Sequence, residues 1–299
     1  MRILVTGASG LVGSALVPDL VSKGHEVIRL VRAEPKHGTA EIRWNPEKGV
    51  SDATRLEWLD AVVHLAGENI SEGRWTEEKK ARIRESRVKG TRVLAEALAQ
   101  LAAPPKVLVS ASAIGFYGNR GDEVLNEQSA SGDDFLAEVC REWELATRPA
   151  ASKGTRVVNL RFGVILSKRG GALAKMLTPF KLGVGGRVGG GEQYMSWITL
   201  DDVTGAINHA LTNEALHGPV NVVAPRPVTN LEFTKTLGGV LSRPTLFPVP
   251  AFALRLAFGE MADALLLSSM RVEPLRLKET GFVFQYPELE GALSHILRK

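Results

Sequence analysis

Short apolar runs alternate with stretches of helical periodicity along the first half of the chain. The apolar runs lie at residues 3–5, 27–31, 61–65, 106–110 and 157–162. Strand and helix patterns that alternate in this way are typical of a parallel sheet with helices packed on both faces. The sequence therefore predicts an α/β fold with a doubly wound parallel sheet, which binds its ligands at the carboxyl ends of the strands.

The second half of the chain has a different pattern. Prolines gather in residues 225–250, and two amphipathic stretches follow at 251–270 and 285–297. The polar positions of the first stretch carry both charge signs, whereas a helix on a membrane surface needs mainly Lys and Arg there. We expect this region to form a smaller C-terminal domain that closes over the ligand cleft.

Three glycines separate the first apolar run from the first predicted helix. Gly7, Gly10 and Gly13 are spaced three residues apart, and helix-compatible residues 14–23 follow. At these three positions glycine permits a tight turn, the close approach of a pyrophosphate and close packing of the helix on the sheet. The N-terminus of the helix adds free N–H groups that favour an anion. The segment therefore predicts a dinucleotide-binding site of the Rossmann type.

The end of the second apolar run distinguishes between the two nicotinamide cofactors. Proteins that bind NAD place Asp or Glu there, whereas Arg accommodates the 2′-phosphate of NADP. Here the run ends in Arg32 and has no acidic residue after it. A guanidinium matches a phosphate in geometry and in charge. We therefore predict NADP(H) as the cofactor, with a solvated charge at the strand end as the alternative role of Arg32.

Composition and charge exclude several classes of protein. Hydrophobic residues make up 44% of the chain and charged residues 23%, which is too apolar for a disordered protein. The 37 basic and 33 acidic residues leave a net charge of +4, and the basic residues are scattered apart from 79–84. No nucleic-acid motif accompanies that cluster, so we expect no nucleic-acid partner.

The sequence favours a reducing compartment and no membrane partner. Cys140 is the only cysteine and cannot form an internal disulfide. The chain shows neither a signal peptide nor an uncharged apolar run of about 18 residues, the length that spans a bilayer. We expect a cytoplasmic protein with a small-molecule substrate, and a homodimer is one possible assembly.

Several further segments resemble one known group of proteins. The turn at 6–13 has the form T-G-x-x-G-x-x-G, and more matches follow at 60–67, 86–91, 110–113 and 159–164. Together they resemble the extended short-chain dehydrogenase/reductase superfamily. Details at 68–70, 73–75, 115–118, 195–198 and 221–230 resemble one branch of it, the NADP-binding "epimerase family" with a C-terminal domain of unknown function.

The resemblance implies a division of the chain and a set of cofactor contacts. Residues 1–165 would form the NADP-binding domain, with 195–225 returning to it, and 166–194 together with 226–299 would form the substrate-side domain. The expected cofactor contacts are Thr6, Gly7, Ser9, Gly10, Leu11, Val12, Gly13, Arg32, Leu65, Ala66, Gly67, Ser86 and Arg161.

The acid–base pair that most members of the superfamily use is absent. It is a Tyr-x-x-x-Lys pair, whose spacing places both side chains on one helix face. The residues four positions after Tyr117, Tyr194 and Tyr286, the only tyrosines, are Gly, Ile and Glu. Alignment on the following Trp-Glu helix places Leu136 at the tyrosine position and Cys140 at the lysine position. Neither residue supplies the proton or the charge that is lost.

This loss leaves two hypotheses for the function. In the first, the protein is an NADP(H)-dependent oxidoreductase or epimerase whose acid has moved, with Tyr117 as catalytic residue and Ser112 as hydrogen-bond donor. In the second, it binds NADP(H) with little turnover and acts as a sensor or scaffold. A buried, hydrogen-bonded packing role is an equal alternative for Tyr117.

Other chemistry-bearing residues have simpler interpretations. His64 stands in an apolar strand and is expected to be a hydrogen-bonded core histidine. Cys140 is expected to be a small buried hydrophobe, and Glu138 and Glu142 to lie on a solvated helix face. The acidic pair at 201–202 lacks further spaced ligands and suits the first turn of a helix, so we predict no metal site.

The segment after the sixth strand is rich in glycine. Residues 170–191 contain eight glycines, and aromatic and hydrogen-bonding residues follow directly. We interpret the segment as a substrate lid or wall, with a flexible linker as the alternative. Arg187, Gln193 and Trp197 are the predicted substrate contacts, and Arg187 suits an anionic group. Core packing is an equal interpretation for Trp197.

Overall fold

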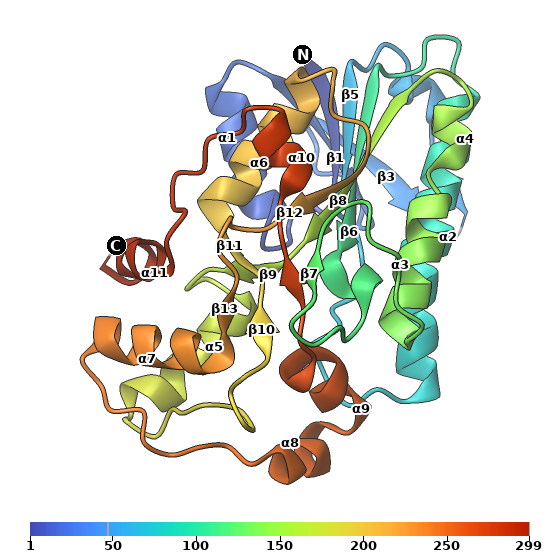
Figure 1. Ribbon diagram of the computed structural model, residues 1–299. Helices are drawn as coiled ribbons and strands as arrows, with labels where there is room; N and C mark the ends of the chain where they lie inside the picture. The colour runs from blue at the N-terminus through green and yellow to red at the C-terminus, as the bar shows by residue number, and fades with distance from the viewer. Residues whose placement is uncertain (47, 299) are drawn as a thin grey trace.

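The computed structural model describes residues 1–46 and 48–298, and its centre is an eight-stranded sheet (Figure 1). The strand order is β12-β8-β6-β5-β1-β2-β3-β4. All neighbouring strands are parallel except β3 and β4. The strands are β1 (Arg2–Thr6), β2 (Glu26–Val31), β3 (Glu41–Asn45), β4 (Gly49–Val50), β5 (Ala61–His64), β6 (Val107–Ala113), β8 (Arg156–Phe162) and β12 (Gly218–Val222). The predicted α/β fold is confirmed.

Helices cover both faces of this sheet, because its strands carry apolar side chains on both faces. One face packs on α1 (Gly13–Ser22) and α6 (Leu200–Thr212), and the other on α2 (Glu77–Ala99), with α3 (Phe135–Leu145) and α4 (Arg148–Ala151) on the same side (Figure 1). Alternate residues of β1 are buried against the helices on opposite faces of the sheet. Ile3 and Val5 are buried with the α1–α6 layer, whereas Leu4 is buried with α2.

The smaller elements gather at the carboxyl end of the sheet. Three short strand pairs join β9 (Val164–Leu166) with β11 (Trp197–Thr199), β10 (Tyr194–Met195) with β13 (Val228–Thr229), and β7 (Val124–Leu125) with β14 (Arg271–Val272). The helices of this part are α5 (Gly171–Lys181), α7 (Asn230–Leu241), α8 (Ala251–Phe258), α9 (Glu260–Ala262) and α11 (Leu289–Arg298), whereas α10 (Leu275–Glu279) packs against β12 beside α6. Leu173, Phe233 and Leu293 share one buried cluster, so α5, α7 and α11 pack together.

Two predicted elements are divided in the structure. The amphipathic stretch at 251–270 is broken at Gly259, whose φ of +62° ends α8, and continues as α9 and a π-helical turn at Asp263–Leu267. The predicted sixth strand at 159–164 ends at Phe162. A Cβ on Gly163 would lie 2.5 Å from the carbonyl oxygen of Ser196, so the chain crosses another backbone at this point.

The edge strand β12 lies within the segment 195–225 that was expected to return to the first domain. The division into two domains otherwise stays a prediction. In the part of the chain that the structure describes, no helix combines the length and the apolar character needed to cross a bilayer.

Candidate functional site

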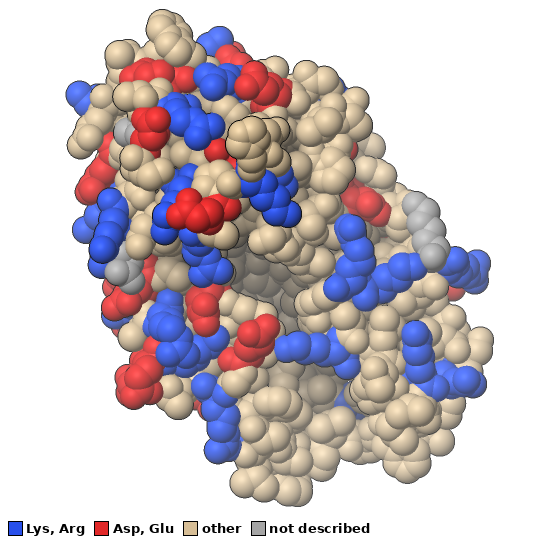
Figure 2. All heavy atoms as spheres, turned by 180° about the vertical axis from the view of Figure 1, so that it is seen from behind, with Lys and Arg blue, Asp and Glu red and all other residues tan. Residues whose placement is uncertain are grey.

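A cleft of about 690 Å³ opens at the carboxyl ends of β1 and β5, where the glycine turn meets the N-terminus of α5. Seen from behind, the molecule is hollowed between its upper and lower parts, with Lys and Arg side chains on both sides of the hollow (Figure 2). The cleft is lined by Gly7, Gly10, Leu11, Val12, Gly13, Leu65, Gly67, Asn69, Ser71, Glu72, Ala111, Phe162, Gly170, Gly171, Ala174 and Lys175.

The three glycines of the turn differ in what surrounds them. Gly7 has a φ of +67°, and a Cβ there would lie 2.7 Å from the backbone of Leu65. A Cβ on Gly13 would lie 2.2 Å from the carbonyl oxygen of Gly7. A Cβ on Gly10 would come near only the carbonyl oxygen of Gly7, at 3.3 Å. Gly7 and Gly13 are therefore fixed by close backbone packing, whereas Gly10 leaves an uncovered surface toward the cleft.

A buried hydrogen-bond chain fixes the ends of β1 and β5 beside the turn. The Thr6 hydroxyl accepts from the backbone N–H of Leu65 at 3.1 Å and lies 2.8 Å from His64 Nδ1. His64 Nε2 lies 3.0 Å from Thr91 Oγ1, which also accepts from Trp143 Nε1. Burial lowers the pKa of His64 to about 4, so its ring is neutral at pH 7. The prediction of a core histidine is confirmed.

Other predicted cofactor residues lie around the cleft and not in its lining. Thr6 and Ala66 belong to the strand-end contact just described. Ser9 is exposed on the glycine turn, and the Ser86 hydroxyl accepts from the backbone N–H of Glu68. Arg32 follows β2 and is exposed, and it has no hydrogen-bond or ion-pair partner within residues 1–46 and 48–298. These roles stay predictions.

The far wall of the cleft lies in the segment 170–191, which we interpreted as a substrate lid or wall, but the residues that form it were not among the predicted contacts. Gly170 and Gly171 begin α5, and a Cβ on either would contact the Leu11 side chain at 3.5 or 3.4 Å. Lys175, one turn further along, donates to Ser71 Oγ at 3.0 Å and to its carbonyl oxygen at 2.7 Å. The two adjacent glycines before a helical pattern were the available signal. Only the fold brings them opposite the glycine turn.

The positions of the absent Tyr-x-x-x-Lys pair face the end of β6. A Cβ on Gly115 would lie 3.4 Å from Leu136 Cβ and 4.0 Å from Cys140 Sγ. Burial raises the pKa of the Cys140 thiol to about 12, with Glu144 adding to the rise. The thiol is therefore uncharged at neutral pH, and the interpretation of Cys140 as a small buried hydrophobe is confirmed.

A guanidinium lies near the place that the lysine would fill. Gly67 lines the cleft, and a Cβ added to it would lie 3.5 Å from the Cζ of Arg87 on α2. Arg87 is half-buried, lies over the Trp143 ring at 5.0 Å and donates to the carbonyl oxygens of Ile83 and Glu68. Within the described residues its hydrogen bonds go to neutral acceptors, so its charge is not cancelled by a hydrogen-bonded carboxylate. The sequence signal was the segment 86–91, which contains Arg87 and resembles a segment of the superfamily in which many relatives carry Asn-x-x-Gly-Thr; Arg87 stands at the Asn position.

Ser112 and Arg161 belong to a separate network behind the cleft. The Ser112 hydroxyl donates to Glu144 Oε1 at 2.8 Å. Arg161 forms a two-pronged ion pair with the same carboxylate, at 2.8 and 2.9 Å. The Arg161 side chain is 3% exposed and lies 3.4 Å over the Phe116 ring. Neither Ser112 nor Arg161 lines the cleft, and their catalytic and cofactor roles stay predictions.

Tyr117 completes that network. It is fully buried, its hydroxyl donates to Asn221 Oδ1 at 2.8 Å, and it accepts from Arg161 at 3.0 Å. Burial raises the pKa of Tyr117, and the charge of Arg161 opposes only part of the rise. These contacts are the ones expected of a packing aromatic with a hydrogen-bonded hydroxyl. A catalytic role for Tyr117 stays a prediction.

The three predicted substrate contacts are not brought together in the cleft. Arg187 is exposed and donates to the carbonyl oxygen of Gly190. Gln193 Nε2 donates to the carbonyl oxygens of Val188 and Leu266. Trp197 is fully buried in the cluster of α5 and α7. Trp197 thus has the surroundings of its core-packing interpretation, and the substrate roles stay predictions.

The glycine-rich segment before these residues packs against a second segment. Val188 forms a bridge with Val249, and a Cβ on Gly186 would lie 1.7 Å from the carbonyl oxygen of Phe247. Such an approach is open only to glycine. The packed backbone argues against the alternative of a flexible linker.

Two groups of acidic residues have structural roles. Asp201 and Asp202 lie in the first turn of α6, as predicted, and Thr199 caps that helix. Asp202 also accepts from the backbone N–H groups of Gln285 and Tyr286. Glu138 and Glu142 both pair with Arg84 at the surface, which fits the predicted solvated helix face.

The doubly wound sheet, the glycine turn and the cleft at the strand ends define a Rossmann-type dinucleotide-binding fold. The model of the NAD dependent epimerase/dehydratase family matches residues 3–224, and a domain of unknown function, DUF1731, matches residues 249–296. The chain belongs to this epimerase/dehydratase family. The resemblance to the "epimerase family" branch of extended short-chain reductases is thereby confirmed.

Similar proteins come from bacteria and animals. The epimerase family protein MT2273 of Mycobacterium tuberculosis is 45% identical over 98% of this chain and 96% of its own. A crystal structure of the human epimerase family protein SDR39U1 with NADPH has a TM-score of 0.92, with 37% identity and complete coverage of both chains. A nucleoside-diphosphate sugar epimerase from Corynebacterium glutamicum has a TM-score of 0.83 and 41% identity, over 99% of this chain and 58% of that one.

Proposed function

We propose that the protein binds NADP(H) in the glycine-turn cleft and acts there on a small anionic molecule as an oxidoreductase or epimerase. The carrying observation is the cleft itself. It places an uncovered glycine backbone near Arg32, Arg87 and Lys175, none of which forms a salt bridge with a carboxylate within the described residues. The similar human protein was crystallised with NADPH, which supports the choice of cofactor.

The residues at the turn fit a dinucleotide. Gly10 presents backbone without a Cβ, and the N-terminus of α1 supplies free N–H groups for a pyrophosphate. Arg32 follows the strand whose end selects between the cofactors, and its guanidinium is free to bind the 2′-phosphate. Leu65 and Gly67 form the wall beside them.

The reacting end of the cleft would lie between Gly67 and α5. When bound there, the cofactor supplies or accepts a hydride. Arg87 stands behind Gly67 and brings a positive charge near the position where Cys140 has replaced a lysine. We assign to Arg87 the binding role of the absent lysine, which is to hold the ribose and the nicotinamide in place. It cannot act as an acid because guanidinium does not release its proton near pH 7.

The substrate wall is positively polarised. The N-terminus of α5 points at the cleft, Lys175 adds an ammonium, and Asn69 and Ser71 add hydrogen-bonding groups. A carboxylate or phosphate on the substrate would be held by this wall. Glu72 and Lys175 are the charged side chains among the residues that line the cleft, so they are the ones that would pair with charged groups of a bound molecule.

A cofactor comparison tests the first part of the proposal. Replacing Arg32 by Ala should raise the Kd for NADPH roughly tenfold, because a charge-assisted bond to the 2′-phosphate is lost. The Kd for NADH should not change. The measurement is fluorescence titration of both cofactors, with Arg92→Ala as a control, because Arg92 is an exposed arginine on α2. Equal binding of NADH and NADPH to the wild type would reject the assignment.

A second pair of variants tests Arg87. Arg87→Met removes the charge and keeps the length of the side chain, so NADPH affinity should fall roughly tenfold. Arg87→Lys restores a charge and should recover part of the loss. A loss that both variants share equally would show that Arg87 contributes only packing against Trp143.

Turnover distinguishes the enzyme from the sensor hypothesis. The protein with NADPH is incubated with a panel of carbonyl compounds and nucleoside-diphosphate sugars, and cofactor oxidation and epimer formation are measured. The enzyme hypothesis expects turnover of at least one anionic compound, with a higher KM in Lys175→Met. Tight NADPH binding without turnover of any compound would favour the sensor or scaffold.

A further inference from the structure

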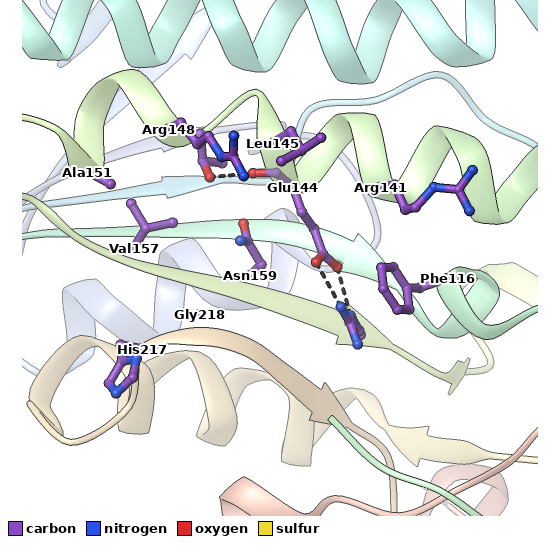
Figure 3. A pocket seen from close by; sticks show the side chains of 12 residues that line it. Phe116, Arg141, Glu144, Leu145, Arg148, Ala151, Val157, Asn159, His217 and Gly218 are labelled. Atoms are coloured by element: carbon purple, nitrogen blue, oxygen red, sulfur yellow. Dashed lines mark hydrogen bonds and ion pairs between the residues drawn. The ribbon is translucent and has the colours of Figure 1, made fainter. Parts of the chain in front are cut away.

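A second pocket, of about 520 Å³, lies beneath the corner where α3 meets α4 (Figure 3). Its lining shares no residue with the glycine-turn cleft. One face of β8 forms its floor through Val157, Asn159 and Arg161, and Leu145 and Ala151 of the helices lie over it. The neighbouring strand β12 is the edge of the sheet, so the pocket opens past its first residue to solvent.

Asn159 stands on the floor of this pocket with an unmet hydrogen-bond requirement. The residue is 7% exposed, and its Oδ1 is buried without a partner among the described residues. Buried polar atoms in folded proteins are nearly always paired, and an exception calls for a specific cause. Val157, Leu145 and Ala151 also line the pocket and have no hydrogen to donate, and the Thr147 hydroxyl donates to the carbonyl oxygen of Glu144. A molecule that enters the pocket can supply the missing donor.

The charges around the pocket favour an anion. Its lining holds three arginines and one carboxylate, Glu144, which is already committed to Arg161 by the two-pronged ion pair. Arg141 donates to Ser131 Oγ and to a backbone carbonyl, and neither acceptor carries a charge. Arg148 is exposed and has no side-chain partner within residues 1–46 and 48–298. Figure 3 shows Arg141 and Arg148 on the helical side of the pocket, at its two ends.

We propose that this pocket is a binding site for a small hydroxylated organic anion. A hydroxyl of the ligand donates to Asn159 Oδ1, its carbon skeleton lies on Val157 and Ala151, and its carboxylate or phosphate is held by Arg148, while Arg141 adds positive charge at the other end of the pocket. The volume is within the range of small-molecule sites, and a guanidinium binds either anion through paired N–H groups. The site is distinct from the cleft, and the proposal does not depend on the function proposed there.

Four probes test the site: glucose 6-phosphate, gluconate, glucose and inorganic phosphate. Each is titrated into the full chain, with and without saturating NADPH, and followed by calorimetry and amide NMR shifts. The hydroxylated anions should bind at least about fivefold more tightly than glucose or phosphate, since only they meet both requirements. The tighter of glucose 6-phosphate and gluconate identifies phosphate or carboxylate as the preferred group. NADPH should leave these affinities unchanged.

Matched variants locate the binding. Arg148→Ala and Asn159→Leu should each weaken the tighter probe at least about fivefold, whereas Arg92→Ala, a change at another exposed arginine, should not. Arg148 is exposed, so its variant decides the question even if Asn159→Leu fails to fold. Binding of none of the probes below about 10 mM would overturn the proposal. So would binding that Arg148→Ala leaves unchanged, or that NADPH abolishes.

Discussion

The glycine-turn cleft and the network behind it lie side by side but differ in how their polar groups are used. In the cleft, Gly10 leaves backbone uncovered, and Arg32, which follows β2 outside the lining, has no ion-pair or hydrogen-bond partner in the described parts of the chain. In the network, the polar side chains of Ser112, Arg161 and Tyr117 all bond to other side chains of the protein. The first region is arranged to receive a molecule, whereas the second is arranged to hold itself together.

The same contrast separates the cofactor-binding turn, which is retained, from the Tyr-x-x-x-Lys pair, which is absent. The cofactor half keeps the open glycine backbone, but α3 has Leu136 and Cys140 at the positions of the acid–base pair, and Tyr117 after β6 is buried. Tyr117 is buried and its hydroxyl makes two hydrogen bonds, so it cannot reach a substrate unless the network opens. The contrast therefore predicts that changes in the network act on stability, and changes in the cleft act on binding.

The largest effect is expected at the buried ion pair. Arg161→Met leaves the Glu144 carboxylate and the Tyr117 hydroxyl buried without their partner, so the free energy of unfolding should fall by about 3–5 kcal/mol. Urea denaturation measures the change. The matched control is Arg255→Met, because Arg255 forms a similar bidentate pair with Asp263 at the surface. That change should cost less than about 1 kcal/mol. Equal losses in the two variants would contradict the comparison.

The buried His64 gives the next largest effect, and it depends on pH. Its pKa is about 4 in the folded protein against 6.5 in the unfolded chain, so the unfolded state takes up a proton first as the pH falls. The contribution is complete above pH 6.5 and is lost progressively between pH 6.5 and 4. From pH 7 to pH 5 the loss should be about 2 kcal/mol.

The measurement is the free energy of unfolding at several pH values for the wild type and for His64→Gln. The glutamine variant lacks this titration, so its stability should fall less steeply between pH 7 and pH 5. Histidines elsewhere, such as His209, contribute equally to both proteins and cancel in the difference. Parallel curves would show that His64 is not held neutral by burial.

The smallest effect is expected at Tyr117. Tyr117→Phe removes the hydroxyl between Asn221 and Arg161, which should lower the free energy of unfolding by about 1–3 kcal/mol because buried partners are left unpaired. NADPH binding should stay unchanged, and so should any turnover found. Tyr194→Phe is the control, since no side-chain hydrogen bond of the Tyr194 hydroxyl is found in the described residues. Loss of turnover with unchanged stability would make Tyr117 catalytic after all.

Much of the fold was readable because it depends on local pattern. Apolar runs predicted five strands of the main sheet to within a few residues, and the spacing of Gly7, Gly10 and Gly13 located the turn. The residues at which helices and strands end were harder to predict. Gly259 divides the stretch at 251–270 because its positive φ ends a helix, and amphipathic periodicity does not record that angle.

The sequence by itself determined the sheet, the nucleotide turn, the exposed arginine after β2 and the absence of Tyr-x-x-x-Lys. These follow from residue types at fixed spacing, which act through backbone geometry and burial within one or two elements. The tertiary structure alone decided which groups share a site. Residues 67 and 87, 11 and 171, and 144 and 161 meet through packing of separate elements. It also decided which polar groups are bonded and which, like Asn159 Oδ1, are not. Hydrogen bonding is short-ranged, so a partner is fixed only when the chain has folded.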